Sequence, residues 1–215
     1  MKLTIKHQEN FSRGQLLLRQ LLGFIYIVLP HYFILLFVGI WQKILIFITW
    51  WVILFTGKYP LSFFEFQVGL IKWQVRLYAR LMNLSDGYPA FGINATDEFS
   101  NFEMERPEKL SRGLLLVKTF FGGFYVVLPH VFILIFRYIG TYFLVFLAFW
   151  VVLFTGKYPK SWHDFVVGTL RWGIRLNLYY GLWMSDTYPP FTGKELESEK
   201  AVEQPKAEIE EKPSE

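Results

Sequence analysis

The stretch at residues 21–56, LLGFIYIVLPHYFILLFVGIWQKILIFITWWVILFT, decides the class of fold. Residues 21–41 are apolar almost without interruption, and residues 44–56 continue the run after only Gln42 and Lys43. A helix needs about 20 apolar residues to cross the roughly 30 Å of hydrocarbon in a bilayer. The first part is long enough for a crossing and the second is short. This stretch therefore predicts an all-α integral membrane protein.

Composition supports the same class. Of the 215 residues, 53% are apolar and 20% are aromatic, which is more than soluble domains usually carry. The chain has no cysteine, which excludes disulfides, thiolate metal sites and cysteine nucleophiles. The first fifteen residues are polar and mixed in charge, so they do not resemble a cleaved signal peptide. We expect the first apolar segment to act as its own insertion signal.

Charge is divided unevenly along the chain. The formal net charge is +4, but residues 94–109 and 194–215 together carry −7, which leaves +11 on the rest. Basic residues therefore lie in and beside the apolar stretches, a pattern that favours contact with anionic lipid headgroups. We expect membrane lipids as partners and no nucleic acid, because the basic residues are interleaved with segments that must be buried.

The sequence contains an internal repeat, because a shift of 99 residues superimposes two long parts of it. This divides the chain into a polar N-terminus at residues 1–10, a membrane module at 11–93, an acidic linker at 94–109, a second membrane module at 110–193 and a disordered acidic tail at 194–215. The matching segments are Ser12-Arg13-Gly14 and Ser111-Arg112-Gly113, Val28-Leu29-Pro30-His31 and Val127-Leu128-Pro129-His130, FTGKYP at 55–60 and at 154–159, and, after one inserted residue, Ser85-Asp86-Gly87-Tyr88-Pro89 and Ser185-Asp186-Thr187-Tyr188-Pro189.

Two arrangements fit the apolar block of each module. One is a transmembrane helical hairpin with crossings near residues 21–40 and 43–57, and the other is one long kinked crossing preceded by a helix in the interface. Basic residues flank both ends of each block, and such residues gather on the cytoplasmic side. This favours an even number of crossings, and therefore the hairpin. We expect a multi-pass protein with its termini and linker in the cytoplasm.

An amphipathic helix is predicted after each FTGKYP segment. Apolar residues recur at spacings of three and four, and charged residues occupy the other faces. A basic amphipathic helix with tryptophan at its boundary is expected to lie in the plane of the headgroups. A helix that packs back on the crossings, or a third crossing, is the alternative. The apolar positions in the first module are Phe63, Phe66, Leu70, Trp73, Leu77, Leu81 and Leu84.

The order of these motifs resembles the bacterial membrane family catalogued as domain of unknown function 4389, here in two tandem copies. The resemblance implies a location in the bacterial cytoplasmic (inner) membrane and no established activity. Ala90 departs from the Pro-Pro-Phe ending that the second copy keeps at residues 189–191. The residues that carry the resemblance are Pro30, His31, residues 55–60, Phe66, Gly69, Trp73, Arg76, Tyr88, Pro89 and Phe91, with their second-copy equivalents.

The two Pro-His pairs are the first candidate site. Pro30 frees a backbone carbonyl about one turn earlier, and His31 brings a titratable group into the apolar block. One hypothesis places His31 and His130 across a pseudo-twofold axis as a proton relay or as metal or haem ligands. The alternative is that each imidazole bonds backbone groups at a proline kink or lies near the membrane interface. We favour the second, and expect no metal and no cofactor, because no carboxylate accompanies the histidines and a metal needs more than two ligands.

Three further pairs of equivalent residues are candidates. Lysines beside a tight turn at Gly57 and Gly156 suit lipid phosphates, with the following tyrosines at the level of the headgroups. Acidic residues at the start of the amphipathic helices suit the helix dipole, or pair with Arg76, Lys72 or a neighbouring group of the module. The candidates are Lys58 and Lys157, Glu65 and Asp164, and Arg76 and Arg175. Asp86 and Asp186 are expected to cap or turn the chain.

Three classes of function remain. The first is an accessory or scaffolding membrane protein that binds lipid headgroups or a partner complex, or associates with further copies of itself. The second is a small transporter or channel component that uses the duplicated Pro-His kinks. The third is a lipid-active enzyme. The first is favoured because the sequence shows no convergent polar cluster and no catalytic residue, so we do not expect an enzyme.

Overall fold

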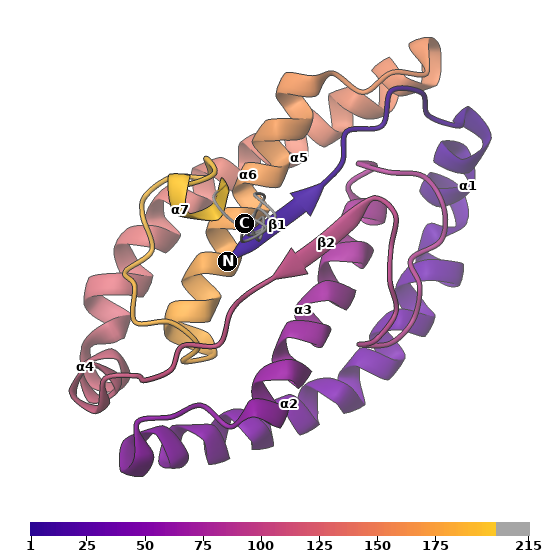
Figure 1. The fold of residues 1–215 in the computed structure, drawn as a ribbon. Helices are drawn as coiled ribbons and strands as arrows, with labels where there is room; N and C mark the ends of the chain where they lie inside the picture. Colours follow the sequence, from indigo (N-terminus) through magenta and orange to yellow (C-terminus); the bar gives the residue numbers. More distant parts are fainter. Residues whose placement is uncertain (201–215) are drawn as a thin grey trace, which may run out of the picture.

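The computed structural model describes residues 1–200 and is mainly helical (Figure 1). The helix bounds between residues 13 and 56 recur 99 residues later, between 112 and 155. The elements in chain order are β1 (Lys2–Ile5), α1 (Arg13–Gly23), the π-helical turn η1 (Phe24–Val28), α2 (Leu29–Thr56), α3 (Leu61–Leu81), β2 (Ser100–Glu103), α4 (Arg112–Gly122), the π-helical turn η2 (Gly123–Val127), α5 (Leu128–Thr155), α6 (Lys160–Leu176), the π-helical turn η3 (Asn177–Gly181) and α7 (Glu197–Lys200).

Two long helices dominate the molecule. The segments α1, η1 and α2 join into one helix of 44 residues, Arg13–Thr56, and α4, η2 and α5 join into a second, Arg112–Thr155. The side chains of Ser12 and Ser111 cap their first turns by accepting backbone N–H bonds. Gly57 and Gly156 end them at φ values of 70° and 75°, the left-handed conformation that glycine adopts without strain. Both helices are long and apolar enough to cross a membrane.

The first long helix passes straight through residues 40–44, where the sequence favoured the turn of a hairpin. Gln42 faces inward, and its amide donates a hydrogen bond to the side chain of Gln67 at 2.8 Å, while Lys43 remains exposed. Two polar residues with good helix propensity do not end a helix, since neither removes a backbone donor. The hairpin prediction is therefore wrong, and each module contains one long helix.

Each long helix widens into a π-helical turn just before its proline. The N–H of Leu29 bonds the carbonyl of Phe24, and the N–H of Leu128 bonds that of Gly123. A proline donates no hydrogen bond, and its ring clashes with the carbonyl four residues earlier. The wider turn makes room for that ring. The carbonyl of Tyr26, four residues before Pro30, loses its usual α-helical partner in the process.

The N-terminal segment and the segment between the modules each contribute a strand. Strands β1 and β2 pair antiparallel, with Lys2 opposite Glu103 and Leu3 opposite Phe102. Leu3 and Phe102 are 99 residues apart and both are buried. The ribbon therefore has a local twofold axis at this pair, and residues near 1–10 and 100–109 occupy equivalent places.

Each half of the chain holds the end of the other half's long helix. The N–H of Phe11 donates to the carbonyl of Gly156, and the N–H of Leu110 donates to that of Gly57, both at 2.8 Å. The guanidinium of Arg13 also reaches the carbonyl of Phe154 at 3.0 Å. The start of each long helix thus lies beside the end of the other, and the two run antiparallel (Figure 1).

Helices α3 and α6 lie inside this frame rather than at its surface. Side chains on most of the circumference of α3 are buried, among them Phe64, Leu70, Trp73 and Leu77. On α6 the buried set includes His163, Val166 and Trp172. A helix lying free in the headgroup plane would bury one face only. The prediction of interfacial helices is wrong, and the alternative of helices that pack back on the apolar ones is correct.

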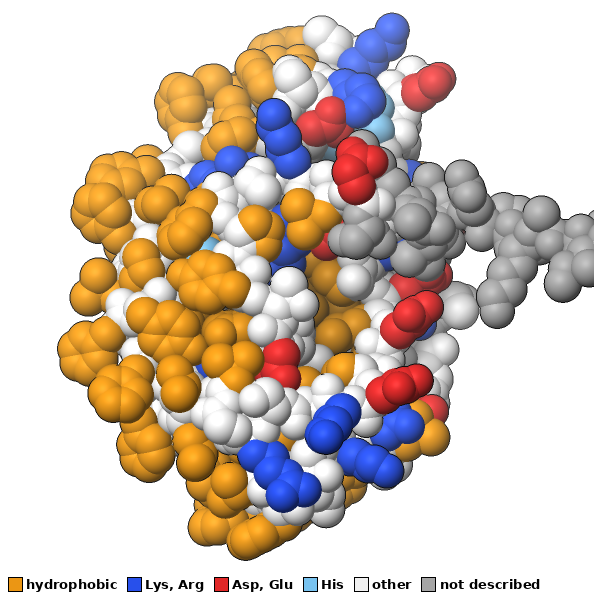
Figure 2. Space-filling model, turned by 60° about the vertical axis from the view of Figure 1, so that its left-hand side comes forward, with side chains coloured by type: hydrophobic (Ala, Val, Ile, Leu, Met, Phe, Trp, Pro, Cys, Tyr) orange, Lys and Arg blue, Asp and Glu red, His pale blue; other side chains and the backbone are white. Residues whose placement is uncertain are grey.

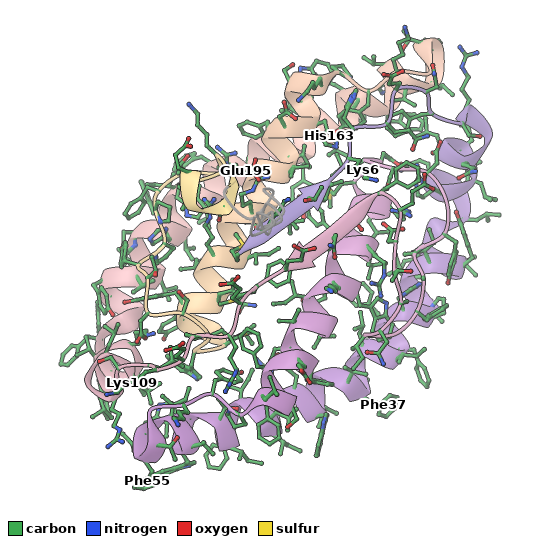
Figure 3. The ribbon with its side chains drawn as sticks, viewed as in Figure 1. Lys6, Phe37, Phe55, Lys109, His163 and Glu195 are labelled. Atoms are coloured by element: carbon green, nitrogen blue, oxygen red, sulfur yellow. The ribbon has the colours of Figure 1, made fainter. Side chains whose placement is uncertain are left out.

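Apolar and charged side chains occupy opposite sides of the molecule (Figure 2). Exposed large apolar residues run along the outer faces of both long helices, from Leu17 to Phe55 and from Leu116 to Phe154. Phe37 and Phe55 project outward from α2 (Figure 3). The charged side chains gather on the face that carries the β1–β2 ribbon. Of the tail predicted to be disordered, residues 194–200 are described and include α7, and residues 201–215 lie outside the described residues.

Candidate functional site

His31 lies at the centre of an aromatic cluster formed by α2, α3 and the segment that follows α3. The indole N–H of Trp73 donates to Nδ1 of His31 at 2.9 Å. The ring of Phe91 stacks on the imidazole with centroids 3.9 Å apart, and the ring of Tyr88 lies at 5.5 Å. Because an indole nitrogen can only donate, Nδ1 accepts, and the proton of the neutral imidazole is on Nε2.

The second half repeats this cluster around His130. The indole N–H of Trp172 donates to Nδ1 of His130 at 2.8 Å. Phe191 stacks on the imidazole at 4.0 Å, and Tyr188 lies at 5.4 Å. Both histidines have no solvent-exposed surface. Each imidazole is therefore buried, although the tyrosine and phenylalanine that cover it are themselves 39–48% exposed.

The tyrosine of each cluster uses the carbonyl that the proline sets free. The hydroxyl of Tyr88 donates to the carbonyl of Tyr26 at 3.0 Å, and the hydroxyl of Tyr188 donates to that of Tyr125 at the same distance. Each hydroxyl lies at the exposed edge of its cluster and gives the freed carbonyl the hydrogen-bond partner that the proline cannot supply. The Pro-His and Tyr-Pro-x-Phe motifs are thus two halves of one contact, which the sequence showed only as separate repeats.

The structure does not bring the two histidines together. The hydrogen bonds and ring contacts of His31 and of His130 go to different residues, each within its own half. Nε2 of each ring makes no hydrogen bond, although the carbonyl of Pro89 lies near His31. Among residues 1–200, no group of three or more His, Cys, Asp or Glu side chains is placed to hold a metal ion. Each imidazole thus packs beside a proline kink, with its hydrogen bond to an indole rather than to the backbone.

Arg76 and Arg175 clamp the segment that carries the Tyr-Pro-x-Phe motif. Arg76 donates to the carbonyls of Ala90, Gly92 and Ala95. Burial lowers the pKa of Arg76 from its ordinary value, while Asp97 acts to raise it and Arg80 to lower it. A guanidinium presents five donors in a rigid fork, which suits several carbonyls at once. Arg76 therefore acts as an internal brace rather than as a free ligand for a substrate.

The equivalent arginine of the second half makes the same kind of clamp. Arg175 donates to the carbonyls of Thr192 and Lys194, and it forms an ion pair with the buried Glu199 of α7. Both clamps require the segment that supplies the carbonyls to lie close to the helix that carries the arginine. A Cβ atom on Gly69 would lie 2.9 Å from Ile93, and one on Gly168 would lie 3.1 Å from the carbonyl of Gly193. Glycine at these two positions lets the segment pass directly over the helix.

The acidic candidates stand apart from these arginines. Glu65 is exposed. Asp164 is also exposed and bonds to Lys160 at 2.6 Å. Burial acts to raise the pKa of Asp164, but the hydrogen bonds from Lys160 and His163 outweigh it and lower the pKa below its ordinary value. Asp164 therefore pairs with Lys160 of its own helix and not with Arg175.

The two candidate lysines follow the glycine turns at the surface of the protein, whereas the tyrosines next to them are buried. Lys58 and Lys157 are exposed just after the two glycine turns. Tyr59 and Tyr158 are buried, at 0% and 2% exposure, and belong to the core. Burial raises the pKa of both hydroxyls. The prediction of tyrosines at the level of the headgroups is therefore wrong, because the chain turns inward directly after each lysine.

A pair of buried basic residues was not among the sequence candidates. Arg19 donates to Asn83 and to the carbonyl of Ser85, and it lies 3.5 Å from Asp86. Its equivalent Lys118, 1% exposed, bonds to Asp186 at 2.9 Å. The same aspartates accept the backbone N–H of Ser12 and Ser111, the residues whose side chains cap the long helices. The 99-residue shift that aligns Arg19 with Lys118 was the available signal.

These features define a class: a mainly helical protein with two long apolar helices whose repeated motif residues brace the fold from inside. A sequence model of the family described as Domain of unknown function (DUF4389) matches residues 118–193. That match begins at the buried Lys118 and ends just beyond Phe191, so it contains the whole second histidine cluster. No curated protein and no solved structure matches the chain.

Proposed function

We propose that this chain is an integral membrane protein without catalytic activity that serves as an accessory or scaffolding component. The observation that carries the proposal is the division of its surface, with apolar side chains along both long helices and charged side chains on the opposite side (Figure 2). An exposed apolar surface of this extent marks an interaction with membrane or protein. The charged side then remains free for headgroups or a partner complex.

We further infer that both halves are copies of the family domain matched at residues 118–193. Each element of the second histidine cluster has a first-half counterpart: Trp73 and Trp172 bond their histidines at 2.9 and 2.8 Å. The family match itself covers the second half only. A bacterial inner-membrane origin remains a prediction from the sequence resemblance.

The burial of His31 and His130 among separate sets of partners favours the accessory role over a transporter. A pathway lined by His31 and His130 requires both imidazoles to face a common space, whereas each is stacked under its own phenylalanine. The exposed Glu65 and the Lys160-bound Asp164 likewise leave no paired carboxylates for a lipid-active enzyme. The motif residues are better explained as braces.

Membrane extraction tests the first part of the proposal. The full chain should stay in the membrane pellet after an alkaline carbonate wash and dissolve only in detergent. Release by carbonate would contradict integral insertion.

The scaffolding role is tested on the charged side. A groove of about 920 Å³ lies between α3 and the ribbon, and its lining includes Glu65 and Lys72. A stoichiometric partner that co-purifies with the chain should be lost from Lys72→Glu and kept by the matched variant Lys43→Glu on the apolar side.

The transporter has a test of its own. Solute flux through vesicles that hold the purified protein, if it is abolished by His31→Ala with His130→Ala, would support the transporter instead.

A further inference from the structure

The long helices are too long to stand upright in a bilayer. Exposed large apolar side chains extend from Leu17 to Phe55 on the first helix and from Leu116 to Phe154 on the second. At 1.5 Å per residue each stripe measures about 57 Å, nearly twice the roughly 30 Å of hydrocarbon. An upright helix would leave about half of its exposed apolar side chains in water.

The symmetry of the fold gives an independent reason. The two long helices run antiparallel, and the local twofold axis passes through the Leu3–Phe102 pair in the ribbon. If the helices stood upright, this axis would lie in the membrane plane, and the charged side of the molecule would face the acyl chains. If the helices lie flat, the axis points along the membrane normal. The charged side then faces water and the apolar side faces lipid.

The exposed surface also shows how deeply the helices sit. Tyr32, Phe33 and Ile34 are consecutive and are 57%, 62% and 40% exposed. Consecutive helical residues are about 100° apart, so these three cover more than half of the circumference. A helix that only touched the headgroups would expose a narrower apolar stripe. The outer surface of α2 therefore requires immersion among acyl chains.

The basic residues suit this placement. Between residues 20 and 57 the only Asp, Glu, Lys or Arg is Lys43, and between 119 and 156 it is Arg137, which the protein holds through Thr169 and Phe165. The exposed ends of the long helices carry basic side chains instead, and these reach anionic headgroups when the helices lie flat. They are Arg13, Lys58, Arg112 and Lys157.

We propose that the apolar side of this chain docks into a single leaflet of a lipid bilayer, with both long helices lying along the membrane plane and neither crossing it. Lys58 and Lys157, at opposite ends of the molecule, then lie on the same side of the membrane. This inference rests on the proposed membrane function, and it specifies the partner surface as the acyl chains and headgroups of one leaflet.

A depth profile tests the orientation, because the chain has no native cysteine. Phe24, Phe37 and Phe55 are 69%, 57% and 69% exposed along the first long helix. Phe24→Cys, Phe37→Cys and Phe55→Cys, each spin-labelled in the full chain in phosphatidylcholine and phosphatidylglycerol vesicles, should report similar depths. Lys109→Cys, exposed near the same end as Phe55 (Figure 3), is the water-accessible control.

The outcomes separate this inference from the function it rests on. Labels at Phe24 and Phe55 near opposite surfaces, with the Phe37 label at the bilayer centre, would overturn the flat orientation while leaving membrane insertion intact. Labels in water at all three positions would overturn both. In cells, an impermeant thiol reagent should reach Lys58→Cys and Lys157→Cys from the same side. Labelling from opposite sides would show that each long helix crosses.

Discussion

Within each half, the residues of the histidine cluster supply one another's hydrogen-bond partners. His31 accepts from Trp73, and Tyr88 donates to the carbonyl that Pro30 leaves without a helical partner. Removing one member leaves a polar atom without a partner, and in the case of Nδ1 of His31 that atom is buried. The cluster is therefore sensitive to changes that preserve size and shape but remove a single donor.

The indole donor is the most direct test of the cluster. Trp73→Phe leaves Nδ1 of His31 without a donor, which should lower the free energy of unfolding by about 1–3 kcal/mol. Trp172→Phe should have an equal effect. The matched control is Trp51→Phe, since Trp51 is 43% exposed on the apolar side. Thermal unfolding in detergent measures all three. Equal melting temperatures for the control and the cluster variants would count against the structural role.

A buried histidine at the junction of the halves makes stability depend on pH. Burial, reinforced by His7 and Lys160, lowers the pKa of His163, and the opposing hydrogen bond and charge of Asp164 do not offset it. The unfolded chain thus binds a proton more readily than the folded one. The stabilisation is present above the ordinary histidine pKa of about 6.5 and is lost as pH falls through the lower folded value.

His163→Gln removes this titration. Between pH 7 and pH 5 the melting temperature of the wild-type chain should fall relative to that of the variant. Parallel pH curves for the two proteins would show that His163 does not contribute.

The sequence predicted which residues belong to the site but not how they contact one another. The repeat identified Pro30, His31, Trp73 and Tyr88 as members of the motifs, because each has an equivalent in the second half. It did not show that they touch, since Trp73 lies 42 residues after His31 and the contact depends on how α3 packs back. The arginine clamps were missed because their partners are backbone carbonyls, which have no sequence signature.

At the scale of the elements, one glycine of α3 and one of α2 have different roles. Gly69 of α3 lies against Ile93, whereas a Cβ atom on Gly39 of α2 would meet nothing within 4 Å. Gly69 is thus needed for a close approach of two segments. Gly39 carries only the entropic cost that glycine brings to a helix.

These two glycines form a matched pair of substitutions. Gly69→Ala should displace the segment near Ile93 and lower the free energy of unfolding by about 1–3 kcal/mol. Gly39→Ala should leave stability unchanged or raise it by up to about 1 kcal/mol. Melting temperatures and limited proteolysis of residues 90–99 measure the difference. Equal behaviour of the two variants would contradict the close approach at Gly69.

Local signals predicted the ends of elements better than their course. Ser12 and Gly57 mark the start and end of the first long helix, since a cap and a left-handed turn depend on single residues. The hairpin failed because Gln42 and Lys43 suit a helix interior. The strands were missed because their pairing depends on a distant partner, and at the 99-residue shift the two segments share Glu9 and Glu108 but little else.

At the scale of the whole molecule, the ribbon is where the two halves meet. Phe102 and Leu3 face each other at the symmetry axis with 0% and 1% exposure. Phe102→Ala should therefore cost about 3–5 kcal/mol and loosen both halves, whereas Phe47→Ala, on the apolar side at 66% exposure, should cost little in detergent. Hydrogen exchange should rise in β1 and β2 together. A rise confined to β2 would argue against a shared junction.

The reciprocal backbone hydrogen bonds of Phe11 with Gly156 and of Leu110 with Gly57 bear on how the two halves of this chain arose. Two separate single-module chains placed in this way would form a self-complementary pair, with every contact made twice. In such a homodimer any mutation appears on both sides of the axis. Once the copies are joined in one chain, each side can change alone, and Lys43 opposite Tyr142 and Arg80 opposite Tyr179 in the 99-residue alignment show how far that divergence has gone.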